Sequence, residues 1–320
     1  MGLLDFWTET IGIDPGSQYL RIIKERELVF NERSQISFDK VDNVFSGLGN
    51  SIRTTPKDAI INPVNYCIWD FHGFEMLLRG AIKKALNSNS VVPKSYIMHF
   101  CIPTNTSEVE KRAYRDSGEH AAAKEIYLIH QSCCAAIGLN ILFEIKNFIL
   151  IDFSSSKIEI TIFANSLPIS VGSLRLGTWK IFSIIKNYLH RAYKIDLSEK
   201  EIEDLLTNFK DIQNLDEIKI QYKTVKTKEI RDLLDNFFYL VNDQILETIE
   251  LASNHPDMEK IITRGVYFTG GGSTIDYLRR QIKLDSRIKC TVSQTPLLDN
   301  INGLKVVMAD KEKFKNYIMT

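Results

Sequence analysis

The chain has 320 residues, with 40 basic and 40 acidic side chains, so its formal net charge is zero. This balance gives no general reason to expect a nucleic-acid partner, because such binding rests on a net or patchy basic field. With 44% hydrophobic residues, a chain of this length can bury two cores, and we expect two lobes.

Neither the cysteines nor the apolar segments indicate a metal site, a membrane span or a secretory signal. The five cysteines are odd in number and lack the spacing of metal ligands. No apolar run reaches the roughly 18 residues that a membrane-spanning helix needs, and the segment 1–7 is too short for a signal peptide and lacks a basic start. We therefore expect a cytoplasmic location.

The predicted elements, in chain order, repeat one theme. Two pairs of apolar strands each flank a polar turn, which is typical of a hairpin. The first pair is 11–13 with 19–23, and the second is 148–152 with 159–163. After the first pair we predict a loop-rich, strand-poor stretch to about Cys67. The further predicted elements are helices at 73–86, 107–120 and 132–140 around a strand at 96–103, and, after the second pair, helices at 179–193, 198–209, 228–252 and 274–282. This repetition suggests an internal duplication.

Three segments have the composition of phosphate-binding turns. In IGIDPGS (11–17) and ILIDFSSSKIEITIF (149–163), an apolar strand runs into an aspartate and a turn of small residues. In VYFTGGGS (266–273), a strand leads into three glycines and a predicted helix start. Glycine lets backbone N–H groups approach an anion closely, and the following helix offers its positive end.

The stretch AYRDSGEHAAAKEIYLIHQSCCAAIG (113–138) is the most specific, and CIPTNTSEVEKRA (101–113) and RGVYFTGGGSTIDYL (264–278) accompany it. With these segments the chain resembles a bacterial actin of the MreB type, within the superfamily of actin, Hsp70 chaperones and sugar kinases. The resemblance runs from Met1 to nearly the end. It implies an α/β, actin-like, two-lobed fold of duplicated ribonuclease-H-like domains around a nucleotide cleft.

The resemblance also implies a domain plan. We expect a first lobe over 1–145, with a smaller subdomain at about 32–72, and a second lobe over 146–303, with a subdomain at about 186–250. The C-terminal segment, at about 304–320, is expected to pack back on the first lobe.

The resemblance assigns an adenine-nucleotide site, with ATP or ADP and magnesium as the expected cofactors. Asp14 and Asp152 are the candidates for holding magnesium through water. The expected nucleotide contacts are Asp14, Gly16, Ser17, Gln18, Asp152, Ser154, Ser155, Ser156, Glu203, Gly270, Gly271, Gly272 and Ser273.

Several of these positions depart from the family pattern. Three serines replace the three glycines of the second turn, which adds Cβ atoms near a phosphate and makes positive φ angles costly. Their hydroxyls could still donate hydrogen bonds, and Lys157 could meet a phosphate. In the first turn Tyr19 and Leu20 replace small polar residues, and Leu206 takes the place of a lysine on the adenine side. We therefore predict binding that is weak or lost.

The position expected to direct hydrolysis is altered as well. Gln131 and Ser132 stand where the family commonly has Glu and Pro. A carboxylate can accept a proton from the attacking water, whereas an amide can only orient it. Gln131 is therefore a candidate for positioning water, and we expect a weak ATPase at most. His130 is an alternative base, although a lone histidine at a strand end is more often structural.

Two stretches favour contact with a membrane surface, as in related filaments: the apolar segment 1–7, and two valines in the polar loop 87–95. The residues expected to make it are Leu3, Leu4, Phe6, Trp7, Val91 and Val92. The alternative is that the N-terminal side chains simply pack on the first lobe.

These observations predict a cytoskeletal protein that forms or joins filaments at the inner face of the cell membrane and contributes to cell shape. Its expected partners are further copies or an orthodox paralogue, the membrane surface and membrane-bound cell-shape proteins, with no nucleic acid. The alternative is a small-molecule kinase or another ATPase of the superfamily. A kinase would need an aspartate base beside a second substrate site, and the sequence identifies none.

Overall fold

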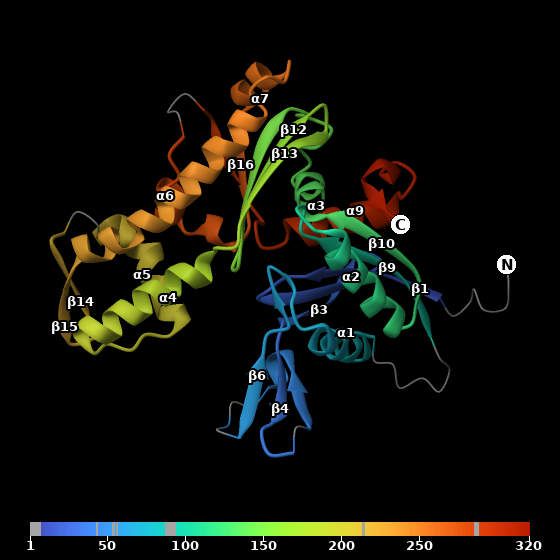
Figure 1. Cartoon of the computed structure of the whole chain (residues 1–320), viewed down its shortest axis with the longest axis horizontal. Coiled ribbons are helices and arrows are strands. Elements are labelled where there is room, and N and C mark those ends of the chain that lie inside the picture. The colour runs from blue at the N-terminus through green and yellow to red at the C-terminus, as the bar shows by residue number, and fades with distance from the viewer. Residues whose placement is uncertain are drawn as a thin grey trace. The chain divides into compact units, whose positions relative to one another are not determined.

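The computed structural model describes residues 8–42, 44–52, 55, 57–86, 94–212, 215–284 and 288–320 (Figure 1). The chain divides into unit 1, Met1–Leu142 with Leu298–Thr320, and unit 2, Phe143–Leu297. The C-terminal segment thus belongs to the same unit as the N-terminal half.

Unit 1 is built on a six-stranded sheet with the order β18-β10-β9-β1-β2-β3. Strands β1, β2 and β3 form an antiparallel meander, and β9 and β10 continue the sheet in parallel from β1. The short C-terminal strand pairs antiparallel with β10 and ends the sheet on that side. The strand bounds are β1 Thr8–Pro15, β2 Tyr19–Lys24, β3 Glu27–Arg33, β9 Ser95–Ile102, β10 Ala123–His130 and β18 Ile318–Met319.

The helices of unit 1 bury apolar faces against this sheet and against one another. Helix α1 begins after Asp70, whose carboxylate accepts the N–H of Gly73, and α2 begins with a capping box of Ser107 and Glu110. Both devices satisfy N–H groups that a helix start leaves without partners. The bounds are α1 Phe71–Ala85, α2 Glu108–His120, α3 Gln131–Gly138 and α9 Asp299–Ala309, with 3₁₀ turns η2 Gly49–Ser51 and η5 Lys315–Tyr317.

The stretch predicted to be loop-rich and poor in strands contains several short strands, so that prediction was wrong. A three-stranded antiparallel sheet, β5-β4-β6, extends beyond α1 in Figure 1, and β7 pairs with β8. These strands span only two to four residues and are partly exposed, which leaves little hydrophobic alternation to detect in the sequence. The bounds are β4 Ile36–Asp39, β5 Phe45–Leu48, β6 Asp58–Ile61, β7 Val64–Asn65 and β8 Cys67–Ile68.

Unit 2 repeats the sheet of unit 1, with the order β13-β12-β11-β16-β17. A meander of β11, β12 and β13 is again followed by two parallel strands. The two hairpins share one register, because Ile13 pairs with Ile22 and Ile151 pairs with Ile160. The bounds are β11 Phe148–Phe153, β12 Ile158–Ala164, β13 Leu167–Leu174, β16 Val266–Thr269 and β17 Cys290–Val292.

Helices cover the sheet of unit 2, and the long helix α6 runs from it to a small hairpin, β14 with β15 (Figure 1). The core includes Phe153, Ile181, Phe209, Phe237 and Ile261. Within the described residues, no helix is long and apolar enough to cross a membrane. The bounds are α4 Thr178–Tyr188, the π-helix η3 Leu189–Tyr193, α5 Glu199–Ile212, β14 Glu217–Ile220, β15 Lys223–Lys226, α6 Thr227–Leu251, α7 Met258–Arg264, η4 Gly271–Thr274 and α8 Asp276–Arg280.

Candidate functional site

The first hairpin places Asp14 at the end of β1, directly across the ladder from Arg21. Arg21 Nη1 lies 3.5 Å from Asp14 Oδ2, and the two residues are 9% and 3% exposed. The guanidinium also lies 5.5 Å from the ring centroid of Tyr19. A buried carboxylate needs a compensating charge, and Arg21 of the same hairpin supplies it for Asp14.

The turn after Asp14 is fixed by hydrogen bonds from the strand and loop that follow it. Ser34 donates its hydroxyl to the carbonyl of Gly16 over 2.5 Å and its N–H to the carbonyl of Gln18 over 3.0 Å. The hydroxyl oxygen of Ser17 accepts the N–H of Tyr66 over 3.1 Å. These hydrogen bonds within unit 1 hold the turn in one defined backbone conformation.

The second hairpin places two acidic residues opposite each other, because Asp152 pairs with Glu159 across the ladder. The hydroxyl of Ser154 donates to Asp152 Oδ1 over 2.6 Å, and Lys157 Nζ lies 2.9 Å from Glu159 Oε2. Asp152, Lys157 and Glu159 are 4%, 4% and 1% exposed. This buried cluster contains two carboxylates and one ammonium.

The three serines of this turn adopt ordinary backbone conformations. None of Ser154, Ser155 and Ser156 has a positive φ angle, so the turn does not carry the backbone strain that serine would suffer at such an angle. The carbonyls of Ser154 and Ser155 accept the N–H groups of Thr178 and Trp179 at the start of α4, over 3.2 and 2.9 Å. The turn therefore uses the first free N–H groups of that helix, which would otherwise be available to an anion.

The triple-glycine turn adjoins the second hairpin. Thr269 pairs with Asp152 in the parallel ladder of β11 and β16, and Gly270 follows with a φ of +80°. A Cβ atom at position 270 would lie 2.3 Å from Asp152 Oδ1. The turn continues as the 3₁₀ helix η4, in which Ser273 donates its hydroxyl to the carbonyl of Gly270 over 2.7 Å. Unit 2 thus brings Asp152, Ser154 and Gly270–Ser273 together.

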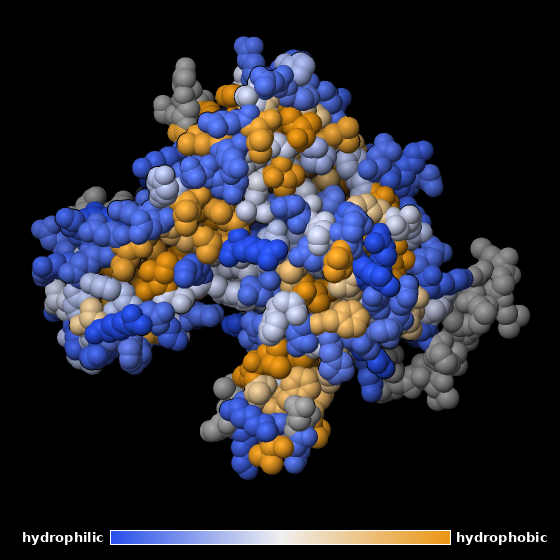
Figure 2. Space-filling view, viewed as in Figure 1, coloured by the Kyte–Doolittle hydropathy of each residue, from blue (hydrophilic) through white to orange (hydrophobic). Residues whose placement is uncertain are grey.

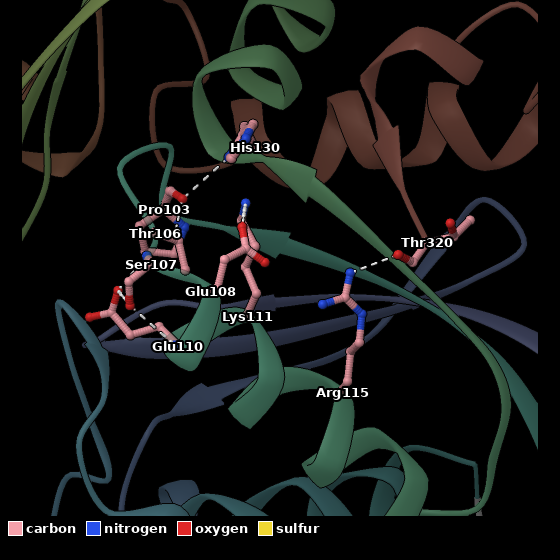
Figure 3. Close-up of polar contacts among 9 residues, drawn as sticks. All are labelled: Pro103, Thr106, Ser107, Glu108, Glu110, Lys111, Arg115, His130 and Thr320. Carbon is pink, nitrogen blue, oxygen red and sulfur yellow. Dashed lines mark hydrogen bonds and ion pairs between the residues drawn. The ribbon is translucent and has the colours of Figure 1, made fainter.

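Gln131 begins helix α3, beside the loop that follows β9. Its side chain is 93% buried, and its amide oxygen has no hydrogen-bond partner among the described residues. The hydroxyls of Ser132 and Thr104 lie 2.9 Å apart, and Nδ1 of His130 lies 3.4 Å from the carbonyl of Pro103. Figure 3 shows His130 at the end of β10, with Pro103 in the neighbouring loop above α2. These contacts favour a structural role for His130, while Gln131 keeps an acceptor that a water molecule could use.

The family model described as MreB/Mbl protein matches residues 8–316. The chain belongs to the MreB/Mbl family. The suspected resemblance is therefore confirmed.

Individual relatives of the family cover nearly the whole chain. It is 26% identical to the cell shape-determining protein Mbl of Bacillus subtilis over 326 residues, which covers 95% of this chain and 96% of the relative. It is also 26% identical to the cell shape-determining protein MreB of Escherichia coli, which covers 91% of this chain and 90% of the relative.

Solved structures confirm the expected actin-like fold. MreB5 of Spiroplasma citri bound to ADP has a TM-score of 0.78 at 19% identity, covering 97% of this chain and 98% of that one. The MamK double helical filament has a TM-score of 0.73 at 14% identity, covering 95% and 99%. Both likenesses concern the fold.

On the adenine side, α5 differs from the pattern that the resemblance implies. Leu206, at the position of the family's lysine, is fully buried in the core of unit 2. Glu203 is exposed on the same helix. The missing lysine is therefore replaced by a core side chain, which cannot donate a hydrogen bond to a ligand.

The charges around the two aspartates disfavour the predicted magnesium site. Arg21 lies beside Asp14, and Lys157 lies in the same buried cluster as Asp152. A divalent cation would be repelled by either group at close range. In the part of the chain that the structure describes, no group of three or more His, Cys, Asp or Glu is arranged to hold a metal ion.

The residues expected to contact a membrane, Leu3, Leu4, Phe6, Trp7, Val91 and Val92, lie outside the described residues. The residues next to them are well defined. Thr8 pairs with Ser95 in the parallel ladder of β1 and β9, and their hydroxyls lie 3.0 Å apart. The segments 1–7 and 87–93 therefore join the sheet through neighbouring strands.

Proposed function

We propose that this chain is a subunit of a cell-shape-determining filament that binds adenine nucleotide weakly and hydrolyses it slowly or not at all. The observation that carries the proposal is the family match over residues 8–316. The relatives from Bacillus subtilis and Escherichia coli are named as cell shape-determining proteins.

Self-association follows from the same kinship, because MamK was solved as a double helical filament. The surface of the small sheet in unit 1 offers apolar side chains for such a contact (Figure 2). Val41, Phe45 and Ile60 are exposed there, and a cluster of exposed apolar residues is typical of an interaction surface. An orthodox paralogue is a second candidate partner for the same contact.

Nucleotide binding is supported by MreB5, which was solved with ADP and with AMPPNP. In this chain we assign the phosphate contacts to the first turn, with Asp14, Gly16, Ser17 and Gln18, and to unit 2. The contacts of unit 2 are Asp152, Ser154, Ser155, Ser156, Gly270, Gly271, Gly272 and Ser273, with Glu203 on the adenine side. The loss of the lysine at position 206 argues for low affinity.

Slow hydrolysis is supported by the geometry around Gln131. Its buried amide oxygen could hold a water molecule, but an amide cannot accept a proton as a carboxylate does. Ser132 replaces proline and is bound to Thr104. We infer that this position orients water without activating it.

A cytoplasmic position at the inner face of the membrane is supported by the register of β1 and β9. The two apolar segments are attached at Thr8 and Ser95, which are neighbours in the sheet. Glu9 strengthens this junction with ion pairs to Lys94 at 2.7 Å and Lys24 at 3.1 Å. The Leu, Phe, Trp and Val side chains of these two segments suit shallow insertion into a lipid surface. Membrane-bound cell-shape proteins would then be within reach.

Negative-stain electron microscopy of the purified chain on lipid, with ATP, with ADP and with no nucleotide, tests the proposal. We expect filaments or sheets on the lipid. Monomers that consume ATP only with an added sugar would instead favour the kinase alternative. Isothermal titration with ATP tests the weak site separately, and a dissociation constant of about 1 µM or tighter together with clear phosphate release would contradict it.

A further inference from the structure

The long helix α6 carries apolar side chains on the face that is turned away from the core of unit 2. Its buried face packs into that core. In Figure 2, hydrophobic residues interrupt the hydrophilic surface where Figure 1 places α6. Exposed apolar side chains that cluster on one face are typical of an interaction surface. Those on α6 are 46% to 74% exposed and comprise Tyr239, Leu240, Leu246 and Leu251.

The same exposed face of α6 is acidic. Asp243, Glu247 and Glu250 are exposed, and they share the face of the apolar side chains because residues three, four or seven apart lie together on a helix. The segment 232–251 contains no lysine, arginine or histidine. Among the described residues, no ion pair joins these three carboxylates to a basic side chain. We call the exposed residues of 239–251 the α6 face.

The position of these acids along α6 is unfavourable for the isolated helix. The helix ends at Leu251, and its last turn contains Glu250 but no basic residue. The C-terminal end of a helix carries partial negative charge, so a carboxylate there is repelled and a lysine or arginine would be stabilising. This arrangement therefore favours a positively charged neighbour for the α6 face over water alone.

Helix α4 and the π-helix η3 present the opposite charge. The segment 176–195 contains no aspartate or glutamate. Lys180, Lys186, Arg191 and Lys194 are exposed, and in the part of the chain that the structure describes none of them forms an ion pair with a carboxylate. We call these four residues the α4 face.

The two faces point to different sides of unit 2. Ile181 and Ile185 of α4 and Leu234 and Val241 of α6 are buried in the same core, so each helix exposes the side that is turned away from it. Figure 1 shows α6 along the upper side and α4 along the lower side of this part of unit 2. The two faces of one copy are therefore directed away from each other, whereas those of two copies can meet.

The lengths of the two faces allow the helices to lie along each other. Helix α6 has 25 residues and is about 37 Å long. Helix α4 and η3 follow each other with 11 and 5 residues, which together span about 24 Å. The shorter, basic element can thus contact the acidic half of α6 over its whole length.

We propose that the α6 face of one copy docks on the α4 face of a second copy. Asp243, Glu247 and Glu250 would pair with the lysines and the arginine, whose aliphatic stems would cover the exposed leucines. Tyr239 offers an aromatic ring to a lysine or arginine. Such a contact deepens the proposed self-association, on which it rests, because it belongs to unit 2, whereas the small sheet belongs to unit 1.

The contact can repeat from copy to copy because it joins two different faces. When two copies meet in this way, one still presents its α6 face and the other its α4 face. An interface of this kind builds open chains or rings, whereas a contact between identical faces closes after two copies. The proposed contact therefore suits a filament or a sheet of filaments.

Reversal of charge on one face at a time tests the contact. We expect Asp243→Lys with Glu247→Lys to raise the protein concentration needed for sedimentation of assemblies by about tenfold in about 0.05 M KCl. Lys186→Glu with Arg191→Glu should have the same effect, because either change places like charges opposite each other. In about 0.5 M KCl the difference from the parent chain should shrink, since salt screens exposed charges.

Restoration of complementary charges separates a lost contact from damage to the fold. The chain with all four substitutions has a basic α6 face and an acidic α4 face, so it should assemble nearly as well as the parent. Equal amounts of the two charge-reversed variants should also co-assemble, because alternating copies are complementary at every contact. Glu217→Lys with Glu259→Lys, at exposed positions of β14 and α7 in the same unit, is the matched control and should leave assembly unchanged.

Cross-linking identifies the contact directly. A carbodiimide joins carboxylates to lysines that touch, and a mixture of isotope-labelled and unlabelled parent chains distinguishes links between copies from links within one copy. We expect mixed links from Glu247 or Glu250 to Lys180 or Lys186 in the mass spectrum. Absence of mixed links, with assembly unchanged in both reversed variants, would overturn the inference. Loss of liposome binding in Lys186→Glu with Arg191→Glu, without any effect of the α6 substitutions, would overturn it by assigning the α4 face to anionic lipid.

Electron microscopy of the same samples distinguishes this contact from the proposed filament function. Filaments that form equally well in the parent and in both reversed variants would overturn the contact and leave the filament function intact. Small oligomers that carry the mixed cross-links but never extend into filaments would support the contact and contradict the filament function. A parent chain that stays monomeric and gives no mixed links would contradict both.

Discussion

Gly270 lies directly against Asp152, since a Cβ atom at position 270 would be 2.3 Å from Oδ1 of the carboxylate. Its φ of +80° is also one that residues with a side chain rarely adopt. We expect Gly270→Ala to lower the free energy of unfolding by about 2 kcal/mol and to weaken ATP binding, because the substitution displaces the aspartate. Denaturant unfolding and isothermal titration measure the two effects.

Gly271→Ala is the control for this prediction. Only a side-chain atom of Leu297, at 3.0 Å, is near the Cβ atom that alanine would add at position 271, and a side chain can move. The control should be much less destabilised than Gly270→Ala. Equal losses would show that the contact with Asp152 has no special importance.

Arg21 compensates a buried carboxylate, so its removal should cost stability. We expect Arg21→Met to lower the free energy of unfolding by roughly 3 kcal/mol, because Asp14 would keep a buried negative charge but lose the guanidinium beside it. Adding Asp14→Asn removes that charge and should recover most of the loss. A double-mutant cycle by urea unfolding measures the coupling, and additive effects of the two substitutions would contradict it.

Helices α3 and α9 approach so closely that their glycines cannot be replaced without movement of backbone. A Cβ atom at Gly303 would lie 1.8 Å from the carbonyl oxygen of Cys134. We expect Gly303→Ala to destabilise the chain by about 2 kcal/mol, as measured by thermal unfolding. Gly80→Ala is the control, because the nearest atom there is the flexible end of Leu48. A larger loss in Gly80→Ala would argue against this account.

Much of the fold could be predicted because the two hairpins carry strong local signals. Each combines an apolar strand, an aspartate and a short polar turn, and family likeness supplied the rest. The short strands β4 to β8 gave no such signal. Strand β13 was also missed, because Pro168 and Gly172 interrupt its pattern. All six strands are stabilised by pairing with neighbouring strands, which sequence periodicity does not report.

The sequence predicted where the residues of the candidate site lie, but not how their charges are paired. The turns and the triple glycine were found, yet the pairing of Arg21 with Asp14 depends on the register across the hairpin. The same is true of the apposition of Asp152 and Glu159. One signal was available, because Lys157 and Glu159 are two residues apart in a strand-like segment and must therefore share a face. The buried position of Leu206 likewise depends on how α5 packs in its unit.

His99 should make stability depend on pH. It is buried in β9, and its ring is tilted by 32° against that of Tyr127 with the ring centroids 4.9 Å apart. Burial, with Lys311 nearby, lowers its pKa from 6.5 to about 4, although the charge of Glu125 acts in the opposite direction. Between these two values the unfolded chain binds more protons than the folded chain, so stability is complete above pH 6.5 and falls as the pH drops toward 4. The full loss is roughly 3 kcal/mol.

Urea unfolding of the parent chain and of His99→Phe over this pH range checks the prediction. The aromatic substitution keeps a ring beside Tyr127 but cannot bind a proton. Subtracting the free energy of unfolding of His99→Phe from that of the parent chain at each pH cancels the contribution of the acidic residues. This difference should change by a few kcal/mol between pH 6.5 and 4. His72→Gln, at an exposed position of α1, should run parallel to the parent chain. A flat difference curve for His99→Phe would contradict the lowered pKa.

Membrane contact should depend on the segments 1–7 and 87–93 together, because Thr8 and Ser95, which follow them in the chain, pair in the sheet. We expect Trp7→Ala with Val91→Asp to reduce co-sedimentation with anionic liposomes by about tenfold or more, since each change removes apolar surface available for interfacial burial. Val109→Asp is the control, because Val109 is equally apolar and 81% exposed but lies in α2. Binding that survives the double substitution would place the lipid contact elsewhere, and an equal loss in Val109→Asp would indicate that any exposed apolar residue of unit 1 contributes.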